Sequence, residues 1–214
     1  MKNYNKNNYE LCCENLCLEF AKHDPEEMAN KSGAKYDSEK KEFTLTYLNR
    51  DYIISYPQGS IELKDDTQRD LFRNDIMKKI LIISYFHRCT KATLQNKWVP
   101  YRELDGASLY NVSSGFTTNK LSQFFGDKGD LFLKVGHSIN AEKIPFGDIG
   151  LKITVFPNIS IALILWLADD ELEANSNILY DPSVVKELLP EDIALLSSLL
   201  IDEVIEIGKQ ILKE

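Results

Sequence analysis

The chain has 214 residues, of which 43% are hydrophobic and 27% are charged. This composition excludes a disordered chain or a fibre, and the length suits one globular domain. A membrane-spanning helix is also excluded, because the longest nearly apolar run, residues 159–168, is half of the roughly 20 residues that such a helix needs. The first residues, MKNYNKNNYE, lack the apolar segment of a signal peptide. We therefore expect a cytoplasmic protein with no membrane partner.

The net charge of −8 is unevenly distributed along the chain. Residues 169–214 hold 12 acidic and 3 basic side chains, whereas residues 69–102 hold eight basic and two acidic ones. These two segments either dock on each other or form two solvated faces. Because the whole chain is acidic, and because Lys78, Lys79 and Arg88 flank an apolar run, we interpret these cations as the polar ends of a buried element. We expect no nucleic-acid partner.

Hydrophobic spacing and capping residues predict the elements of the first half of the chain. Residues 1–8 are rich in Asn and Lys and are expected to form a disordered tail. A helix should follow over residues 9–22, with Leu11, Cys12, Leu16 and Phe20 in its apolar stripe. Capping residues predict a short helix from Asp24-Pro25 to Gly33. A β-hairpin is predicted over residues 42–56, with its turn at Asn49-Arg50. A central buried helix should follow a capping box at residues 67–70 and reach His87. The nearly continuous apolar run within that last segment, residues 80–86, also leaves a strand open.

The second half of the chain alternates between strand and helix signals. Pro100 makes residues 98–104 an edge strand or a bulge, and residues 159–168 have the unbroken apolar character of a strand covered on both faces. The remaining predicted elements are helices over 118–125 and 131–138, strands over 151–155 and 177–180, and two helices that begin at Asp181-Pro182 and Pro190. The sequence therefore predicts a single α+β domain over residues 9–214, a mainly antiparallel sheet covered by helices.

The four cysteines have two interpretations. Cys12, Cys13 and Cys17 lie on one predicted helix, and Cys89 is remote in sequence. A closed zinc or iron–sulfur site needs four ligands, commonly with C-x2-C spacing, and this spacing is absent. Cysteine is among the most buried residue types, so core packing is the favoured interpretation and a thiolate metal site the alternative. We expect no metal.

Histidines and known catalytic motifs give no catalytic constellation. His23, His87 and His137 are widely spaced and follow no metal-binding pattern, so we interpret them as structural imidazoles. The chain contains no phosphate-binding loop, no GxGxxG sequence and no GxSxG elbow. The catalytic residues and the cofactor are therefore unknown from the sequence.

Two dense groups of side chains are the candidate ligand-binding residues. Trp98, Tyr101, Arg102 and Glu103 offer rings for stacking and a guanidinium for an anionic group. An amphipathic lid over the core is an equally good interpretation of these four residues. The second group is Trp166, Asp169 and Glu171, at the end of the most buried strand. An acidic solvated loop there is favoured over a Mg²⁺ or Ca²⁺ site, yet the loop is well placed to border a pocket.

Several short segments occur together in an order that is typical of one family. They are Asp24-Pro25-Glu26-Glu27, Gly33, Tyr36-Asp37, the hairpin 43–56, the central helix, Trp98 to Leu104, Phe124-Phe125-Gly126-Asp127, Gly147-Asp148, Leu165-Trp166 with Asp169-Asp170-Glu171, and Ile178-Leu179-Tyr180-Asp181. Over roughly residues 20–212 this order resembles the family catalogued as domain of unknown function 3786.

This resemblance implies a biological setting but no reaction. The family has no established activity, its members are typical of anaerobic bacteria and archaea, and some resemble fusions with the four-cysteine iron–sulfur module of corrinoid proteins. The spacing Cys12-Cys13-x3-Cys17 departs from that module. We expect a binding or accessory domain for a protein partner or a small molecule, linked to corrinoid, one-carbon or metalloenzyme metabolism. The alternative is an enzyme or receptor for a small anionic or planar ligand, with its pocket between Trp98–Glu103 and Trp166–Glu173.

Overall fold

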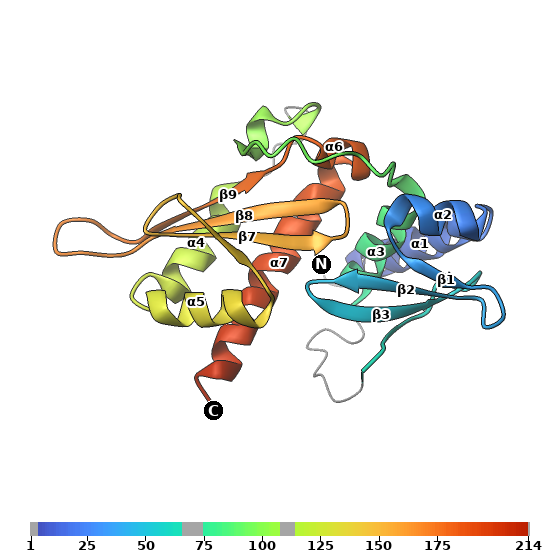
Figure 1. The fold of residues 1–214 in the computed structure, drawn as a ribbon, viewed down its shortest axis with the longest axis horizontal. Coiled ribbons are helices and arrows are strands. Elements are labelled where there is room, and N and C mark those ends of the chain that lie inside the picture. Colours follow the sequence, from blue (N-terminus) through green and yellow to red (C-terminus); the bar gives the residue numbers. More distant parts are fainter. Residues whose placement is uncertain (1–3, 66–74, 108–113, 214) are drawn as a thin grey trace.

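A computed structural model describes residues 4–65, 75–107 and 114–213 of the chain (Figure 1). The helices are α1 (Tyr4–Phe20), α2 (Pro25–Ser32), α3 (Ile76–Arg88), α4 (Ser114–Phe125), α5 (Gly129–Ser138), α6 (Val184–Glu187) and α7 (Pro190–Ile211), with a 3-10 turn η1 (Tyr101–Glu103). The strands are β1 (Lys35–Asp37), β2 (Glu42–Tyr47), β3 (Arg50–Ser55), β4 (Ile61–Leu63), β5 (Val99–Pro100), β6 (Glu142–Ile144), β7 (Ile149–Phe156), β8 (Ile159–Trp166) and β9 (Asn175–Tyr180).

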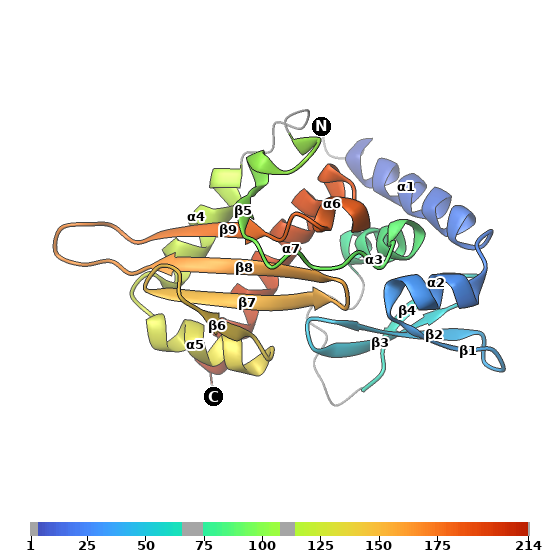
Figure 2. The same cartoon turned by 45° about the horizontal axis from the view of Figure 1, so that its top comes forward.

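The strands form two antiparallel sheets rather than one. The first sheet has the order β1-β2-β3-β4, and the second has the order β5-β9-β8-β7-β6. Helices α4, α5 and α7 cover one face of the second sheet, while α1, α2 and α3 lie beside the first (Figures 1 and 2). The predicted α+β class with antiparallel pairing is confirmed. The sequence predicted one sheet, and the structure has two.

The hairpin of β2 and β3 joins the two sheets at its tip. Tyr47 pairs with Arg50, so the turn residues are Leu48 and Asn49, with φ of 48° and 59°, and not the predicted Asn49-Arg50. A two-residue turn of this kind requires positive φ at both positions, which Asn tolerates and Leu resists. Leu48 is nevertheless buried, and its N–H donates to the carbonyl of Val155 on β7 at 3.1 Å. Its position is therefore fixed by the second sheet.

Helix α1 differs from its prediction at its start and on its buried face. It begins at Tyr4, within the segment expected to be a disordered tail. Leu11 is 56% exposed, whereas Cys13 and Phe20 are buried and Leu16 and Cys17 are half-buried. The four inward positions are spaced by three and four residues, which is one helical face. Leu16 and Phe20 of the predicted stripe face inward, whereas Leu11 and Cys12 are exposed and Cys13 and Cys17 take their place.

Helix α2 has the predicted caps. The Asp24 carboxylate accepts from the N–H of Glu27 at 2.9 Å, and Gly33 ends the helix with φ of 75°. A side chain on Gly33 would meet Pro157, because an added Cβ would stand 2.7 Å from that ring. Both ends of α2 are thus determined locally.

Helix α3 is the central buried element. Residues 80–86, for which the sequence left a strand open, are therefore helical. Its N-cap is Asp75, whose carboxylate accepts from the N–H of Met77 at 2.8 Å. The capping box expected at residues 67–70 lies outside the described residues. Side chains from Ile80 to Phe86 are buried around the whole helix, because α1, α2 and α7 pack against it.

The buried side chains of both sheets and the described helices form one hydrophobic cluster. Phe156 of the second sheet stacks on Tyr85 of α3 at 4.2 Å between ring centroids and lies 5.1 Å from the ring of Tyr47 in the first sheet. One continuous interior of this kind supports a single domain. Among the described residues, the helices lack the combination of length and apolar composition that a bilayer crossing requires.

Candidate functional site

A cavity of about 860 Å³ lies between α1, the β3–β4 connection and the start of α3. The residues that line it are Glu10, Cys13, Glu14, Cys17, Leu18 and Ala21 from α1 and its C-terminal end, Tyr52, Pro57, Gln58, Ser60 and Ile61 from the first sheet, and Asp75, Ile76, Lys78 and Lys79 from α3 and its cap. Small-molecule sites usually occupy roughly 300–1,000 Å³ and combine apolar walls with a few polar groups. The size of this cavity is within that range, and its lining mixes apolar side chains with nearly as many polar and charged ones.

Local structure explains how these residues come to line the cavity. Cys13 and Cys17 are four positions apart on α1, so their thiols lie on the same side of the helix. Gly59, in the β3–β4 connection between the lining residues Gln58 and Ser60, has φ of 66°, and an added Cβ there would stand 3.2 Å from the Cys17 sulfur. Any larger residue at this position would displace the Cys17 side chain. The close approach of the β3–β4 connection to α1 therefore depends on glycine.

A buried polar cluster of four residues adjoins the cavity. Lys78 is 3% exposed, and its Nζ donates to the Tyr52 hydroxyl at 3.2 Å and forms an ion pair with Glu203 of α7 at 3.4 Å. The Tyr47 hydroxyl donates to the same Glu203 carboxylate at 3.3 Å. The ammonium also lies 5.7 Å and 5.2 Å from the ring centroids of Tyr47 and Tyr52. These contacts compensate in part for the removal of two charges from water.

Burial determines the electrostatics of this cluster. It raises the pKa of Glu203, and the charge of Lys78 opposes that rise. Burial together with the negative charge of Glu203 holds the pKa of Tyr47 well above its ordinary value. The cluster therefore keeps a phenol protonated beside a carboxylate with increased proton affinity.

The lysine was misjudged from the sequence. Lys78 was interpreted as a polar end outside the buried element, but its side chain points inward to Glu203. The pair also shows that the basic and acidic segments of the chain dock on each other, at least where α3 meets α7. The sequence feature that could have indicated burial is the position of Lys78 two residues before an apolar run. Exposed lysines often occupy such positions too, so this feature does not distinguish the two cases.

The cysteines are packed rather than clustered. Cys13 and Cys89 are buried, Cys17 is half-buried, and Cys12 is exposed. Burial raises the pKa of the Cys13 thiol to about 11, with Cys17 adding to the shift, and raises that of Cys89 to about 12. Both thiols are protonated at neutral pH, whereas metals bind thiolates. In the described part of the chain, no three Cys, His, Asp or Glu side chains are grouped to hold a metal ion.

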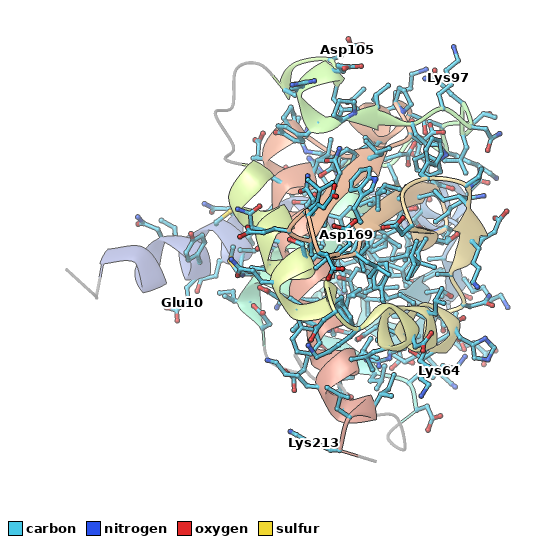
Figure 3. All side chains as sticks on the ribbon, turned by 90° about the vertical axis from the view of Figure 1, so that its left-hand side faces the viewer. Glu10, Lys64, Lys97, Asp105, Asp169 and Lys213 are labelled. Atoms are coloured by element: carbon cyan, nitrogen blue, oxygen red, sulfur yellow. The ribbon has the colours of Figure 1, made fainter. Side chains whose placement is uncertain are left out.

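The two candidate ligand-binding groups lie at opposite ends of β9. Val99, next to Trp98, pairs with Tyr180, whereas Trp166 pairs with Asn175. The five residue steps from Asn175 to Tyr180 correspond to about 17 Å along a strand. In Figure 3, Asp105, which follows η1, lies at the top of the view, away from Asp169 near its middle. The geometry thus does not bring the two halves of the expected pocket together.

Each group has a local structural role. The Tyr101 hydroxyl donates to the carbonyl of Pro190 at 3.0 Å, and its ring packs edge-on against Tyr180. Arg102 and Glu103 are exposed and Trp98 is half-buried. This arrangement fits a lid over the core. These residues therefore have packing contacts whether or not they also bind a ligand.

The acidic run after β8 forms a hydrogen-bonded turn. The Asp169 carboxylate accepts from the N–H groups of Glu171 and Leu172 at 2.8 Å and 2.7 Å, which lowers the pKa of Asp169. Trp166 and Glu171 are exposed beside it. The solvated-loop interpretation accounts for this segment.

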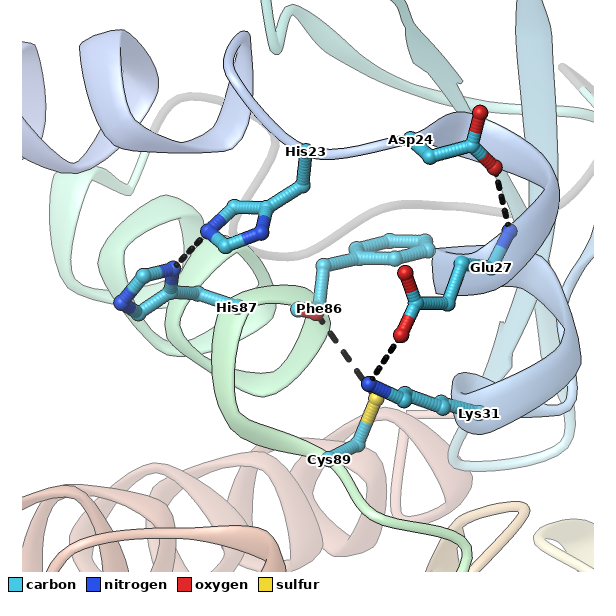
Figure 4. A network of polar contacts seen from close by, with 7 residues as sticks. All are labelled: His23, Asp24, Glu27, Lys31, Phe86, His87 and Cys89. Atoms are coloured by element: carbon cyan, nitrogen blue, oxygen red, sulfur yellow. Dashed lines mark hydrogen bonds and ion pairs between the residues drawn. The ribbon is translucent and has the colours of Figure 1, made fainter.

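Two histidines that are far apart in sequence contact each other beside α3. Nδ1 of His87 lies 2.9 Å from Nε2 of His23, so one ring donates a hydrogen bond to the other (Figure 4). Burial lowers the pKa of His87, and the charges of His23 and Arg88 add to this shift while Glu19 opposes it. The structural interpretation of these two imidazoles holds, and each is the other's partner. His137 is exposed in the last turn of α5.

Two further carboxylates organise the chain between α3 and β5. Glu187 of α6 is fully buried and accepts from the N–H groups of Thr90 and Ala92 at 3.3 Å and 2.7 Å. Asp181 accepts from the N–H groups of Gln95 and Asn96 at 3.1 Å and 2.7 Å. Neither role is predictable from the sequence, because a carboxylate that binds backbone 85 to 97 positions away has no local signature.

Comparison with known proteins gives a family and no characterised relative. A family model described as "Domain of unknown function (DUF3786)" matches residues 24–203, which is most of the chain and agrees with the resemblance over 20–212. No curated protein and no solved structure matches. The chain therefore belongs to the DUF3786 family of domains of unknown function.

Proposed function

We propose that this protein is a binding domain for a small organic molecule, and that the ligand occupies the cavity between α1 and α3. The observation that carries the proposal is the cavity itself, with a volume of about 860 Å³ and a wall in which apolar side chains lie among nearly as many polar and charged ones. The proposal keeps the expected binding role and moves the site away from Trp98–Glu103 and Trp166–Glu173.

The charges at the cavity favour an uncharged or cationic ligand. Lys78 is balanced by Glu203 behind it, which leaves Glu10, Glu14 and Asp75 against Lys79. Leu18, Ile61 and Ile76 supply apolar contacts for the body of the ligand. We therefore propose a mainly apolar molecule with a neutral or positively charged end, and we expect an anion of the same shape to bind more weakly.

The metabolic setting is a separate part of the proposal. A link to corrinoid, one-carbon or metalloenzyme metabolism, a cytoplasmic location and a protein partner are supported by the family resemblance and the sequence composition alone. An enzyme remains the alternative, and the buried Lys78–Glu203 pair is the observation that favours it. Copurification from the native host would test for the protein partner.

The test of ligand binding uses amide NMR shifts with benzyl alcohol, benzylamine and benzoate as probes. We expect benzyl alcohol and benzylamine to shift the amides of Cys13, Cys17, Ile61 and Lys79, and benzoate to bind less tightly. Leu18→Ala should weaken binding about threefold to tenfold, because part of a leucine contact of 1.5–3 kcal/mol is lost.

Leu11→Ala is the matched control for this test. Leu11 and Leu18 are exposed leucines of the same helix, but Leu11 does not line the cavity. Equal effects of the two substitutions, or shifts scattered over the whole surface, would show that the cavity is not the binding site.

A further inference from the structure

The position of Lys78 is unusual for a lysine with a purely structural role. It lines the ligand cavity, yet its ammonium is buried against Glu203 and Tyr52. A buried ion pair is weak evidence for stability, because the desolvation of two charges offsets much of their attraction. An amine with these surroundings at the edge of a cavity has the requirements of a nucleophile instead: desolvation, a proton acceptor and access to a ligand.

The neighbours of Lys78 supply the proton transfers that amine chemistry needs. Glu203 lies 3.4 Å from Nζ and has a raised pKa, so it can accept a proton from the ammonium. The Tyr52 hydroxyl lies 3.2 Å from the same nitrogen, where it can donate to an oxygen bound next to Nζ.

We propose, building on the ligand cavity above, that Lys78 forms an imine with ligands that carry an aldehyde or ketone group. Glu203 takes one proton from the ammonium, and the nitrogen lone pair then forms a bond to the carbonyl carbon. The carbonyl oxygen gains a proton from the Tyr52 hydroxyl, and the nitrogen then returns one of its protons to Tyr52. Glu203 gives the oxygen a second proton, and the bond between this oxygen and the carbon breaks to release water. The products are an iminium ion and one water molecule, so atoms and charge balance.

Reductive trapping tests this step. The protein is incubated with benzaldehyde and cyanoborohydride, and the modified lysines are mapped by peptide mass spectrometry. Access alone would favour the more exposed Lys79 at the same cavity. We expect more label on Lys78 than on Lys79, and we expect Lys134→Arg, an exposed position away from the cavity, to leave the labelling of Lys78 unchanged.

The role of Glu203 has its own variant. Glu203→Gln should lower the rate of labelling at Lys78 about a hundredfold, the lower end of what a general base contributes. If this variant does not fold, the ratio of label on Lys78 to that on Lys79 in the unmodified chain decides the question. Label confined to Lys79 and surface lysines would overturn the inference.

Benzyl alcohol separates this inference from the proposed function. It has nearly the shape of benzaldehyde but cannot form an imine. If benzyl alcohol shifts the cavity amides and Lys78 is not labelled, the covalent role is wrong and the binding function stands. If neither compound affects the cavity, both proposals fail.

Discussion

Buried charges account for the least predictable residues of this protein. Lys78 and Glu203 are 125 positions apart, and neither has neighbours in the sequence that distinguish it from an exposed charged residue. Only the packing of α3 against α7 removes both from water and leaves each as the other's partner. A sequence reports the type of a residue, whereas the free energy of a charged group depends on what surrounds it. The candidate site therefore had to come from the structure.

The histidine pair predicts a pH dependence of stability. The pKa of His87 is lower in the folded protein than its ordinary value of 6.5, mainly because of burial. Stability from the unprotonated His87 ring is fully present above pH 6.5 and is lost as the pH falls through its lower folded-state pKa. We expect the melting temperature to fall between pH 7.5 and 5, and His87→Gln to reduce this fall.

His137→Gln is the control for that measurement, because His137 is an exposed histidine on another helix. It should leave the pH dependence as it is. NMR titration of the ring nitrogens would report the two imidazoles directly. Identical melting curves against pH for the unmodified chain and His87→Gln would contradict a role for the pair.

Among the elements, helix caps and strand patterns were the most predictable features. Asp24 and Gly33 bound α2, and alternation identified β2 and β7, because these signals depend on residues within a few positions. The three-residue strands β1, β4 and β6 were missed, since so few residues give no period. The turn at Leu48-Asn49 was missed by one residue because a leucine there opposes local preference.

The connection between α3 and β5 is predicted to depend on Glu187. This carboxylate accepts from the N–H groups of Thr90 and Ala92 and from the Thr90 hydroxyl at 3.0 Å. Glu187→Ala leaves these donors without their acceptor and should lower the free energy of unfolding by about 2–4 kcal/mol. Urea unfolding measures the loss, and hydrogen exchange should accelerate at the Thr90 and Ala92 amides.

Lys186→Ala serves as the control, because Lys186 is the exposed neighbour in the same short helix. It should change stability by less than about 0.5 kcal/mol. An equal loss in both variants would mean that α6 itself, rather than the Glu187 carboxylate, holds the connection.

The whole molecule should unfold as one unit because its two sheets share one interior. Phe156 contacts Tyr47 from the first sheet and Tyr85 from α3. Phe156→Ala opens a cavity at this junction and should cost about 3–5 kcal/mol in unfolding free energy. Hydrogen exchange should then accelerate equally at Leu45 of β2 and Leu163 of β8.

Phe146→Ala tests the specificity of that effect. Phe146 is 41% exposed, so its truncation should have little effect on stability. Faster exchange in only one sheet of Phe156→Ala would show two independently packed bodies and contradict a single interior.

The sequence by itself determined the α+β class, the antiparallel strands, the caps of α2 and the family, because each depends on local periodicity, on single capping residues or on the order of short segments. The tertiary structure alone decided where the cavity between α1 and α3 lies. This cavity is located where α1 packs across α3 beside the first sheet, and Lys78 in its wall is buried against Glu203 of α7. Chemically dense segments such as Trp98–Glu103 stand out in a sequence, but proximity in space is set by strand register and helix packing.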